Sequence, residues 1–211
     1  MKLMLTSDGI SNPSLRKALK GLVKGKIKIA FIPTAANVEW GDKDWLIKNF
    51  IDCQKIGEVD IVDIAALDKK DWLPRLKEAN VIFVGGGNDI YLMDHIKKSG
   101  LANELPKLLE TRVYVGISAG SAILSKIFSF RGESYYEEQD GKEHKGLGYV
   151  DFRVFPHLNS PYFPKIREEL FNGLPQKLDL DIYAIDDRSA VIVDEGKVSV
   201  VSEGKWKYYP K

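Results

Sequence analysis

The sequence has one cysteine, three histidines and almost no excess of charge, and each scarcity excludes a class of protein. The single cysteine, Cys53, excludes an internal disulfide and is typical of a reducing compartment, so we expect a cytoplasmic location. The formal net charge of +1 argues against nucleic acid or an anionic membrane as a partner. No apolar run approaches the roughly 20 residues that span a bilayer. The first residues also lack the apolar core and cleavage site of a signal peptide.

Strands alternate with helical patterns through the first 125 residues, and this order predicts a mostly parallel sheet with helices on both faces. A chain of 211 residues can bury one core, so we predict a single α/β hydrolytic domain over residues 1–211. Cys53 shares a helical face with Leu46 and Phe50, which predicts a core position for it. Residues 131–148 are polar and predict a long loop, and Val198–Val201 with Trp206–Tyr209 predict a C-terminal antiparallel hairpin.

The chain is organised around Gly116-Ile117-Ser118-Ala119-Gly120, which fits the G-x-S-x-G pattern of a nucleophile elbow. A buried strand, Val113–Ile117, precedes the serine, and an apolar helix start follows it. The two glycines permit the close chain approach that a sharp turn demands. An ordinary strand-to-helix turn would give the same bare pattern, but these flanks favour Ser118 as a nucleophile.

A second glycine-rich segment, Gly85-Gly86-Gly87-Asn88, ends the strand that precedes the elbow strand. Ligands bind beyond the carboxyl ends of the strands in an open parallel sheet, so this loop is expected beside Ser118. A glycine N–H and the Ala119 N–H would then form a two-donor oxyanion hole. A phosphate cradle is the competing interpretation, but the Lys-Ser/Thr of a P-loop is missing.

A nucleophilic serine needs a base, and the sequence offers His95, His144 and His157. His95 lies in a predicted helix and His144 in a charged stretch, where both are most simply structural or solvated. His157 ends an extended segment at a proline-rich loop, which is a usual place for a site residue. It is therefore the favoured base, although a packed histidine at a strand end is the alternative.

The acid that would orient the base is less determined, because four carboxylates follow the serine: Asp186, Asp187, Glu133 and Asp151. Asp186 and Asp187 share a turn between two apolar strands, and alternation predicts that only one of them faces His157. Capping of that turn is the alternative role for either residue. The order serine, histidine, acid fits the α/β-hydrolase fold poorly, because that fold places the acid before the histidine.

Three motifs together, Val-Gly-Gly-Gly-Asn at 84–88, Gly-Ile-Ser-Ala-Gly-Ser at 116–121 and Pro-His-Leu at 156–158, resemble the peptidase E family of serine peptidases, which includes the cyanophycinases. The resemblance covers nearly the whole chain. It implies a fold like that of class I glutamine amidotransferases and cleavage of dipeptides after an N-terminal aspartate, without metal or cofactor.

Carried over by motif, the resemblance makes Ser118 the nucleophile and His157 the base, and it places Gly86 or Gly87 with Ala119 in the oxyanion hole. The position that usually holds a glutamate matches Asp187, which is one methylene shorter. Asn88 becomes a candidate for binding the substrate. Arg167, on the predicted helix after His157, is the candidate cation for an aspartyl carboxylate, although a solvated helix residue is the alternative.

Three functional hypotheses remain open at this point. The first is a dipeptidase acting on small peptides, and the second is an amidohydrolase of the cyanophycinase type with another substrate. The third is a binding protein that uses the same scaffold without turnover. A homodimer and a monomer are equally compatible with the sequence.

Overall fold

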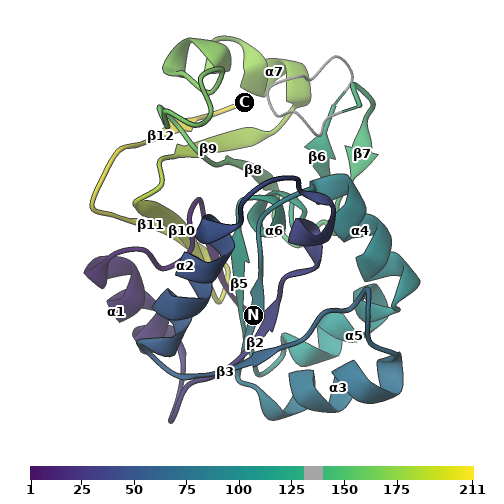
Figure 1. Cartoon of the computed structure of the whole chain (residues 1–211). Coiled ribbons are helices and arrows are strands. Elements are labelled where there is room, and N and C mark those ends of the chain that lie inside the picture. Colours follow the sequence, from purple (N-terminus) through teal and green to yellow (C-terminus); the bar gives the residue numbers. More distant parts are fainter. Residues whose placement is uncertain (131–139) are drawn as a thin grey trace.

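A computed structural model, which describes residues 1–130 and 140–211, shows a central seven-stranded sheet with helices on both faces (Figure 1). The strand order is β11-β10-β1-β5-β4-β2-β3. The strands of this sheet are β1 (Lys2–Thr6), β2 (Lys28–Ile32), β3 (Glu58–Ile61), β4 (Val81–Val84), β5 (Val113–Ile117), β10 (Ser189–Asp194) and β11 (Lys197–Ser202). The five from β1 to β3 in this order are parallel, and β10 and β11 add an antiparallel edge. The predicted mostly parallel sheet is therefore confirmed.

Alternate residues of each strand point to opposite faces of the sheet, and a different set of helices covers each face. Met4 of β1 packs with α1 (Pro13–Leu22) and α2 (Asp44–Gln54) on one face. Leu3 and Leu5 face the opposite side, which is covered by α3 (Lys69–Glu78), α4 (Asp89–Lys98), α5 (Leu101–Leu108) and α6 (Ala119–Ala122). Cys53, on the buried face of α2, is fully buried as predicted, and burial raises the pKa of its thiol.

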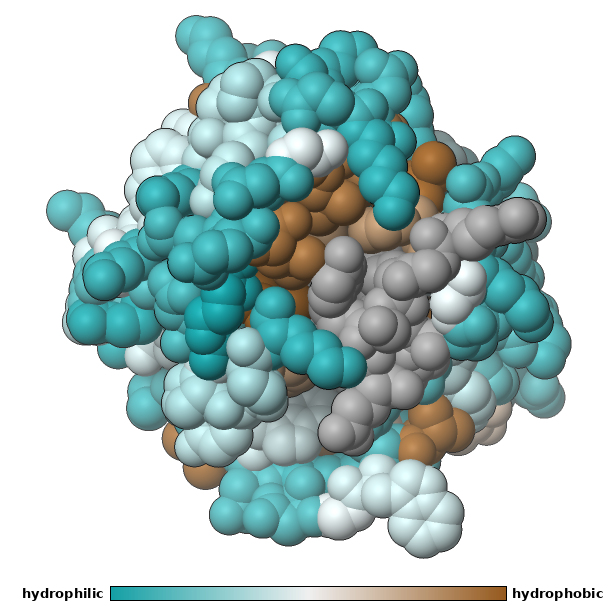
Figure 2. Space-filling view, turned by 90° about the horizontal axis from the view of Figure 1, so that it is seen from above, coloured by the Kyte–Doolittle hydropathy of each residue, from teal (hydrophilic) through white to brown (hydrophobic). Residues whose placement is uncertain are grey.

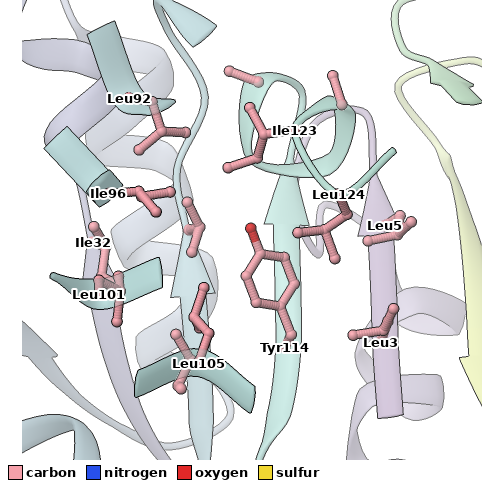
Figure 3. Close-up of a cluster of buried hydrophobic side chains, with 14 of the residues drawn as sticks. Leu3, Leu5, Ile32, Leu92, Ile96, Leu101, Leu105, Tyr114, Ile123 and Leu124 are labelled. Carbon is pink, nitrogen blue, oxygen red and sulfur yellow. The ribbon is translucent and has the colours of Figure 1, made fainter. Parts of the chain in front are cut away.

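The core on the α3–α6 side supports the elbow directly. Figure 3 shows Tyr114 of β5 among buried leucines and isoleucines, with its hydroxyl pointing toward the turn above β5. That hydroxyl donates a hydrogen bond to the carbonyl oxygen of Gly120 at 2.7 Å. Burial raises the pKa of Tyr114, so the phenol stays protonated and can act as this donor. The packing of β5 therefore also fixes the start of α6.

A smaller three-stranded sheet, in the order β12-β9-β8, lies above the central sheet in Figure 1. Its strands are β8 (Phe152–Phe155), β9 (Asp181–Ile185) and β12 (Trp206–Tyr209). The remaining elements are the short pair β6 (Ile127–Ser129) and β7 (His144–Lys145), the 3-10 turns Thr34–Val38 and Glu168–Phe171, and α7 (Leu174–Leu178). The chain crosses from the small sheet to the central one between β9 and β10, at Asp186 and Asp187.

The predicted C-terminal hairpin is wrong in its pairing. β11 and β12 do not pair with each other, because β11 pairs with β10 and β12 pairs with β9. The turn at Ser202-Glu203-Gly204 carries the chain from one sheet to the other, and the Asp186 carboxylate accepts a hydrogen bond from Lys205 N–H beside it. A short turn between two apolar strands looks the same in sequence whether or not the strands pair. Among residues 1–130 and 140–211, no helix is long and apolar enough to cross a membrane.

Candidate active site

Four chain segments meet where the two sheets join. Ser118 follows β5, and Ser7 follows β1, its parallel neighbour in the central sheet. His157 follows β8, and Asp187 follows β9, its parallel neighbour in the small sheet. Because the carboxyl ends of parallel neighbours lie at the same edge, each sheet delivers a pair of polar residues to one place.

The backbone at Ser118 has the conformation expected of an elbow, with φ 46° and ψ −106°. The two glycines flank it tightly, because a Cβ at Gly116 would lie 2.5 Å from the Gly120 carbonyl oxygen. A Cβ at Gly120 would lie 2.3 Å from the carbonyl oxygen of Val84 in β4. Ser118 N–H donates to the Thr6 carbonyl at 3.0 Å. The elbow is therefore held by β1 and β4 on either side of β5.

The structure brings Ser118, His157 and Asp187 into one hydrogen-bonded line. The Ser118 Oγ lies 3.0 Å from His157 Nε2, and His157 Nδ1 lies 2.7 Å from Asp187 Oδ1. The imidazole is also held from outside the line, because Phe163 stacks on it with 3.9 Å between the ring centroids. The direct 2.7 Å contact shows that the shorter aspartate reaches the imidazole without an intervening atom.

The ionised state of Asp187 determines which ring nitrogen of His157 carries the proton. Burial alone would raise the pKa of its carboxyl, but the hydrogen bond and charge of His157, together with the Ser7 hydroxyl, lower that pKa to about 2. An ionised carboxylate can only accept, so the proton between the two groups sits on Nδ1. Nε2 is then free to accept a proton from the Ser118 hydroxyl.

The other candidate acids are placed differently. The Asp186 carboxylate turns away from His157 and accepts hydrogen bonds from Arg188 N–H, Lys205 N–H and the Ser189 hydroxyl, so it caps the turn. Asp151 has an 87% exposed side chain and pairs with Lys126. Glu133 lies outside the described residues.

The remaining histidines lie apart from the line. His95 of α4 is half-buried and packs against Tyr91. His144 of β7 contacts Asp140 at 2.9 Å and stacks on Phe128, so it is less solvated than the sequence suggests.

The glycine loop runs beside Ser118, as expected from the strand order. A Cβ at Gly86 would lie 3.3 Å from the Ser118 Cβ. Gly87 has φ 123°, and a Cβ there would lie 2.4 Å from the Ala35 carbonyl oxygen. Within the described part of the chain, no hydrogen bond from the N–H of Gly86, Gly87 or Ala119 to another residue is present. Asn88 caps α4, with its side-chain oxygen accepting from Tyr91 N–H at 2.8 Å.

A small cavity opens at Ser118 and contains charge of both signs. It is lined by Ser118, Ala119, Ala122, Phe128, Val154, Pro156, Asp89 and Arg153. Asp89 and Arg153 are both buried, and the Arg153 guanidinium lies 4.1 Å from the centre of the Phe155 ring. Figure 2 shows exposed hydrophobic surface near the centre of the face seen from above, with hydrophilic side chains above it and to its left.

Arg167 takes a different place from the one the sequence suggested. Residues 160–167 form turns, and the helix predicted after His157 is reduced to a 3-10 turn at Glu168–Phe171. The Arg167 Nη1 donates to the carbonyl oxygens of Ser160, Phe163 and Ile166. It therefore braces the loop that carries Phe163 against the imidazole.

Sequence reasoning missed Ser7, Phe163 and Arg153. Ser7 carried a usable signal, because it directly follows the first strand and polar residues after parallel strands converge. Arg153 gave none, since an arginine inside a strand is ordinarily exposed.

Comparisons with known proteins identify the family of the chain. A sequence model described as peptidase family S51 matches residues 3–201. The uncharacterized peptidase Lin0382 of Listeria innocua is 25% identical over 213 residues, which cover 96% of this chain and 98% of that protein. Peptidase E of Streptomyces coelicolor is 28% identical over 130 residues, which cover 59% of this chain and 53% of that protein.

Two solved structures share the fold. One is a Listeria monocytogenes protein described as a peptidase E, with a TM-score of 0.77 and 22% identity over 96% of this chain and 98% of that one. The other is a peptidase from an acI-B1 Actinobacterium, with a TM-score of 0.75 and 22% identity over 99% and 93% of the two chains.

Proposed function

Because this chain belongs to peptidase family S51 and is therefore a serine-type peptidase, we propose that Ser118, His157 and Asp187 are its catalytic triad. The observation that carries the proposal is the continuous line of contacts at 3.0 Å and 2.7 Å from the Ser118 hydroxyl to the Asp187 carboxylate. The strained backbone at Ser118 supports it, since strain of this kind gathers at functional sites.

In the proposed reaction, the Ser118 Oγ attacks the carbonyl carbon of the scissile amide while His157 Nε2 takes the hydroxyl proton. The N–H groups of Ala119 and of Gly86 or Gly87 stabilise the oxyanion, at roughly 3–4 kcal/mol for each donor. His157 returns the proton to the leaving amine as the carbon–nitrogen bond breaks. A water molecule then hydrolyses the acyl-enzyme, with His157 again taking and returning the proton.

The proposed substrates are short peptides, foremost dipeptides with an N-terminal aspartate, with Asn88 and an arginine near the acyl group. Arg167 remains the cation proposed from the sequence, and Arg153 is a second candidate because it is buried in the cavity wall beside Ser118. We also propose that the chain forms a single domain whose fold resembles that of class I glutamine amidotransferases.

The test compares Ser118→Ala with Ser121→Ala in a screen of dipeptides and in labelling by a fluorophosphonate. Ser121 is the matched control because its hydroxyl is buried in the same turn but donates to the Thr6 carbonyl at 2.8 Å. We expect Ser118→Ala to abolish hydrolysis and labelling, and Ser121→Ala to keep both. Turnover by Ser118→Ala would refute the mechanism. Labelling of Ser118 without dipeptide turnover would favour an amidohydrolase, and no labelling would favour a binding protein.

A further inference from the structure

Ser7 makes three contacts that all converge on the two residues behind Ser118. Its Oγ lies 2.7 Å from Asp187 Oδ1, 2.8 Å from the backbone nitrogen of His157 and 3.2 Å from His157 Nδ1. The side chain is fully buried at the end of β1. Within residues 1–130 and 140–211, Ser7 is the serine whose hydroxyl contacts both the Asp187 carboxylate and the His157 imidazole. Ser160 lies beside both residues as well, but it reaches His157 through its backbone N–H.

Hydrogen-bond direction leaves Ser7 one arrangement. The His157 backbone N–H can only donate, and Nδ1 carries a proton because it faces an ionised carboxylate, so Ser7 Oγ accepts from the former and cannot donate to the latter. The single Ser7 proton must therefore go to Asp187 Oδ1. One hydroxyl thus holds the acid by donation and the base by acceptance.

The backbone of His157 needs this support. Its φ of 65° lies in the left-handed region, which a non-glycine residue occupies only when its surroundings hold it there. The bond from its N–H to Ser7 fixes the peptide on one side, and Ser160 N–H donating to the His157 carbonyl at 3.0 Å fixes the other. Without Ser7, a buried N–H would lose its acceptor and Asp187 would lose a donor.

Ser7 is also linked to the elbow through the chain itself. The carbonyl of its neighbour Thr6 accepts from Ser118 N–H at 3.0 Å and from the Ser121 hydroxyl at 2.8 Å. Two consecutive residues at the end of β1 therefore hold all three groups. Thr6 holds the nucleophile through its main-chain carbonyl, and Ser7 holds the acid and the base through its side chain.

We propose that Ser7 is a positioning residue of this peptidase, which orients Asp187 and His157 toward Ser118 without touching the substrate. The inference rests on the proposed triad. It predicts that losing the hydroxyl slows the attack by Ser118 while the fold survives.

The experiment measures the second-order rate of fluorophosphonate labelling at Ser118, which needs no knowledge of the natural substrate. We expect Ser7→Ala to lower this rate roughly 10- to 100-fold, the loss typical of a hydrogen bond to a charged group. The low-field proton NMR signal of Nδ1–H should shift or broaden in the same variant. A merely structural role would leave that signal unchanged in the folded protein.

Ser11→Ala is the matched control, because the Ser11 hydroxyl binds the backbone carbonyl of Asp187 at 3.0 Å rather than its carboxylate. We expect a loss of less than about threefold there. If circular dichroism shows that Ser7→Ala is unfolded, Ser7→Cys replaces it, since a thiol fills the site but is a weak donor. Its rate should still fall clearly below that of Ser11→Ala.

Two results would overturn the inference. One is a wild-type labelling rate in folded Ser7→Ala or Ser7→Cys. The other is an equal loss in Ser11→Ala with an unchanged Nδ1–H signal, which would mean that the hydroxyls only anchor the loop. Either result leaves the triad intact as long as Ser118→Ala is unlabelled. An unlabelled wild-type protein would instead refute the triad, and the role of Ser7 with it.

Discussion

Replacing Asp187 with asparagine removes one charge and reverses one hydrogen bond. The asparagine amide can point an N–H at His157 Nδ1, which then becomes the acceptor and moves the ring proton to Nε2, facing Ser118. The base would hold a proton where it must receive one. We expect kcat and the fluorophosphonate labelling rate to fall by about four orders of magnitude, as in other triads with this substitution.

The same substitution has a calculable effect on stability. The pKa of Asp187 is about 2 in the folded protein and 3.8 when unperturbed. Ionisation of this carboxyl therefore favours the folded state, by the free energy that corresponds to a pKa difference of about 1.8. At about 1.4 kcal/mol per unit this gives about 2.5 kcal/mol. Because the side chain is 33% exposed, solvent screening reduces it to roughly 1–2 kcal/mol.

The sign follows from the lowered pKa. The stabilisation is fully present above the unfolded pKa near 4 and is lost as the pH falls toward 2. Urea unfolding of the wild-type protein should therefore show a decline in the free energy of unfolding between about pH 5 and pH 2. Asp187→Asn should lack that share of the decline.

Asp186→Asn is the control, because this neighbouring carboxylate caps the turn with Arg188 and Lys205 N–H groups and does not face the imidazole. It should lose roughly 1 kcal/mol of stability and keep kcat within a few-fold. Near-native kcat in Asp187→Asn would refute the assignment, and a loss in Glu133→Gln would move the acid to that residue. Equal pH dependence in both proteins would refute the stability argument.

Two further predictions concern the pocket and the elbow. Arg153→Met and Arg167→Met should be compared on Asp-X and neutral dipeptides. Loss of the arginine that binds an aspartyl carboxylate will raise KM for Asp-X alone. An equal effect on both substrates would remove that arginine from recognition. Gly120→Ala should destabilise by about 1–3 kcal/mol or more in urea unfolding, since its Cβ would lie 2.3 Å from the Val84 carbonyl. Gly21→Ala, in α1 with nothing within 4 Å, should instead stabilise by about 0.5–1 kcal/mol, and the same sign in both variants would contradict the packing argument.

The sequence predicted the central sheet and the neighbourhood of Ser118 because both follow from local patterns. Buried strands appear as apolar runs, and the elbow at residues 116–120 is a contiguous motif. Alternation also predicted that only one of Asp186 and Asp187 faces His157, although which one depends on how the chain crosses between the two sheets. That crossing also explains the error at β11 and β12, since strand partners are set by distant residues.

The residues that were missed owe their importance to distant contacts. Ser7 is an ordinary polar residue until β8 and β9 bring His157 and Asp187 against it. Arg153 is buried where its guanidinium meets the rings of Phe130 and Phe155, whose centres lie 5.3 Å and 4.1 Å away. The position of Ser7 directly after a strand is the one local signal of these contacts, and the burial of Arg153 leaves none.

The contact between Ser7 and Asp187 joins residues that are 180 positions apart. β1 leaves the ribosome long before its antiparallel partner β10 and the carboxylate beside it are made. At roughly 5–20 residues per second, about 10–35 seconds of synthesis separate them. During that time the elbow can form, but the acid of the proposed triad has not yet been made. On this proposal, a nascent chain that has not reached Asp187 lacks the group that orients the imidazole, and full hydrolytic activity appears only after β10 has been translated and has paired with β1.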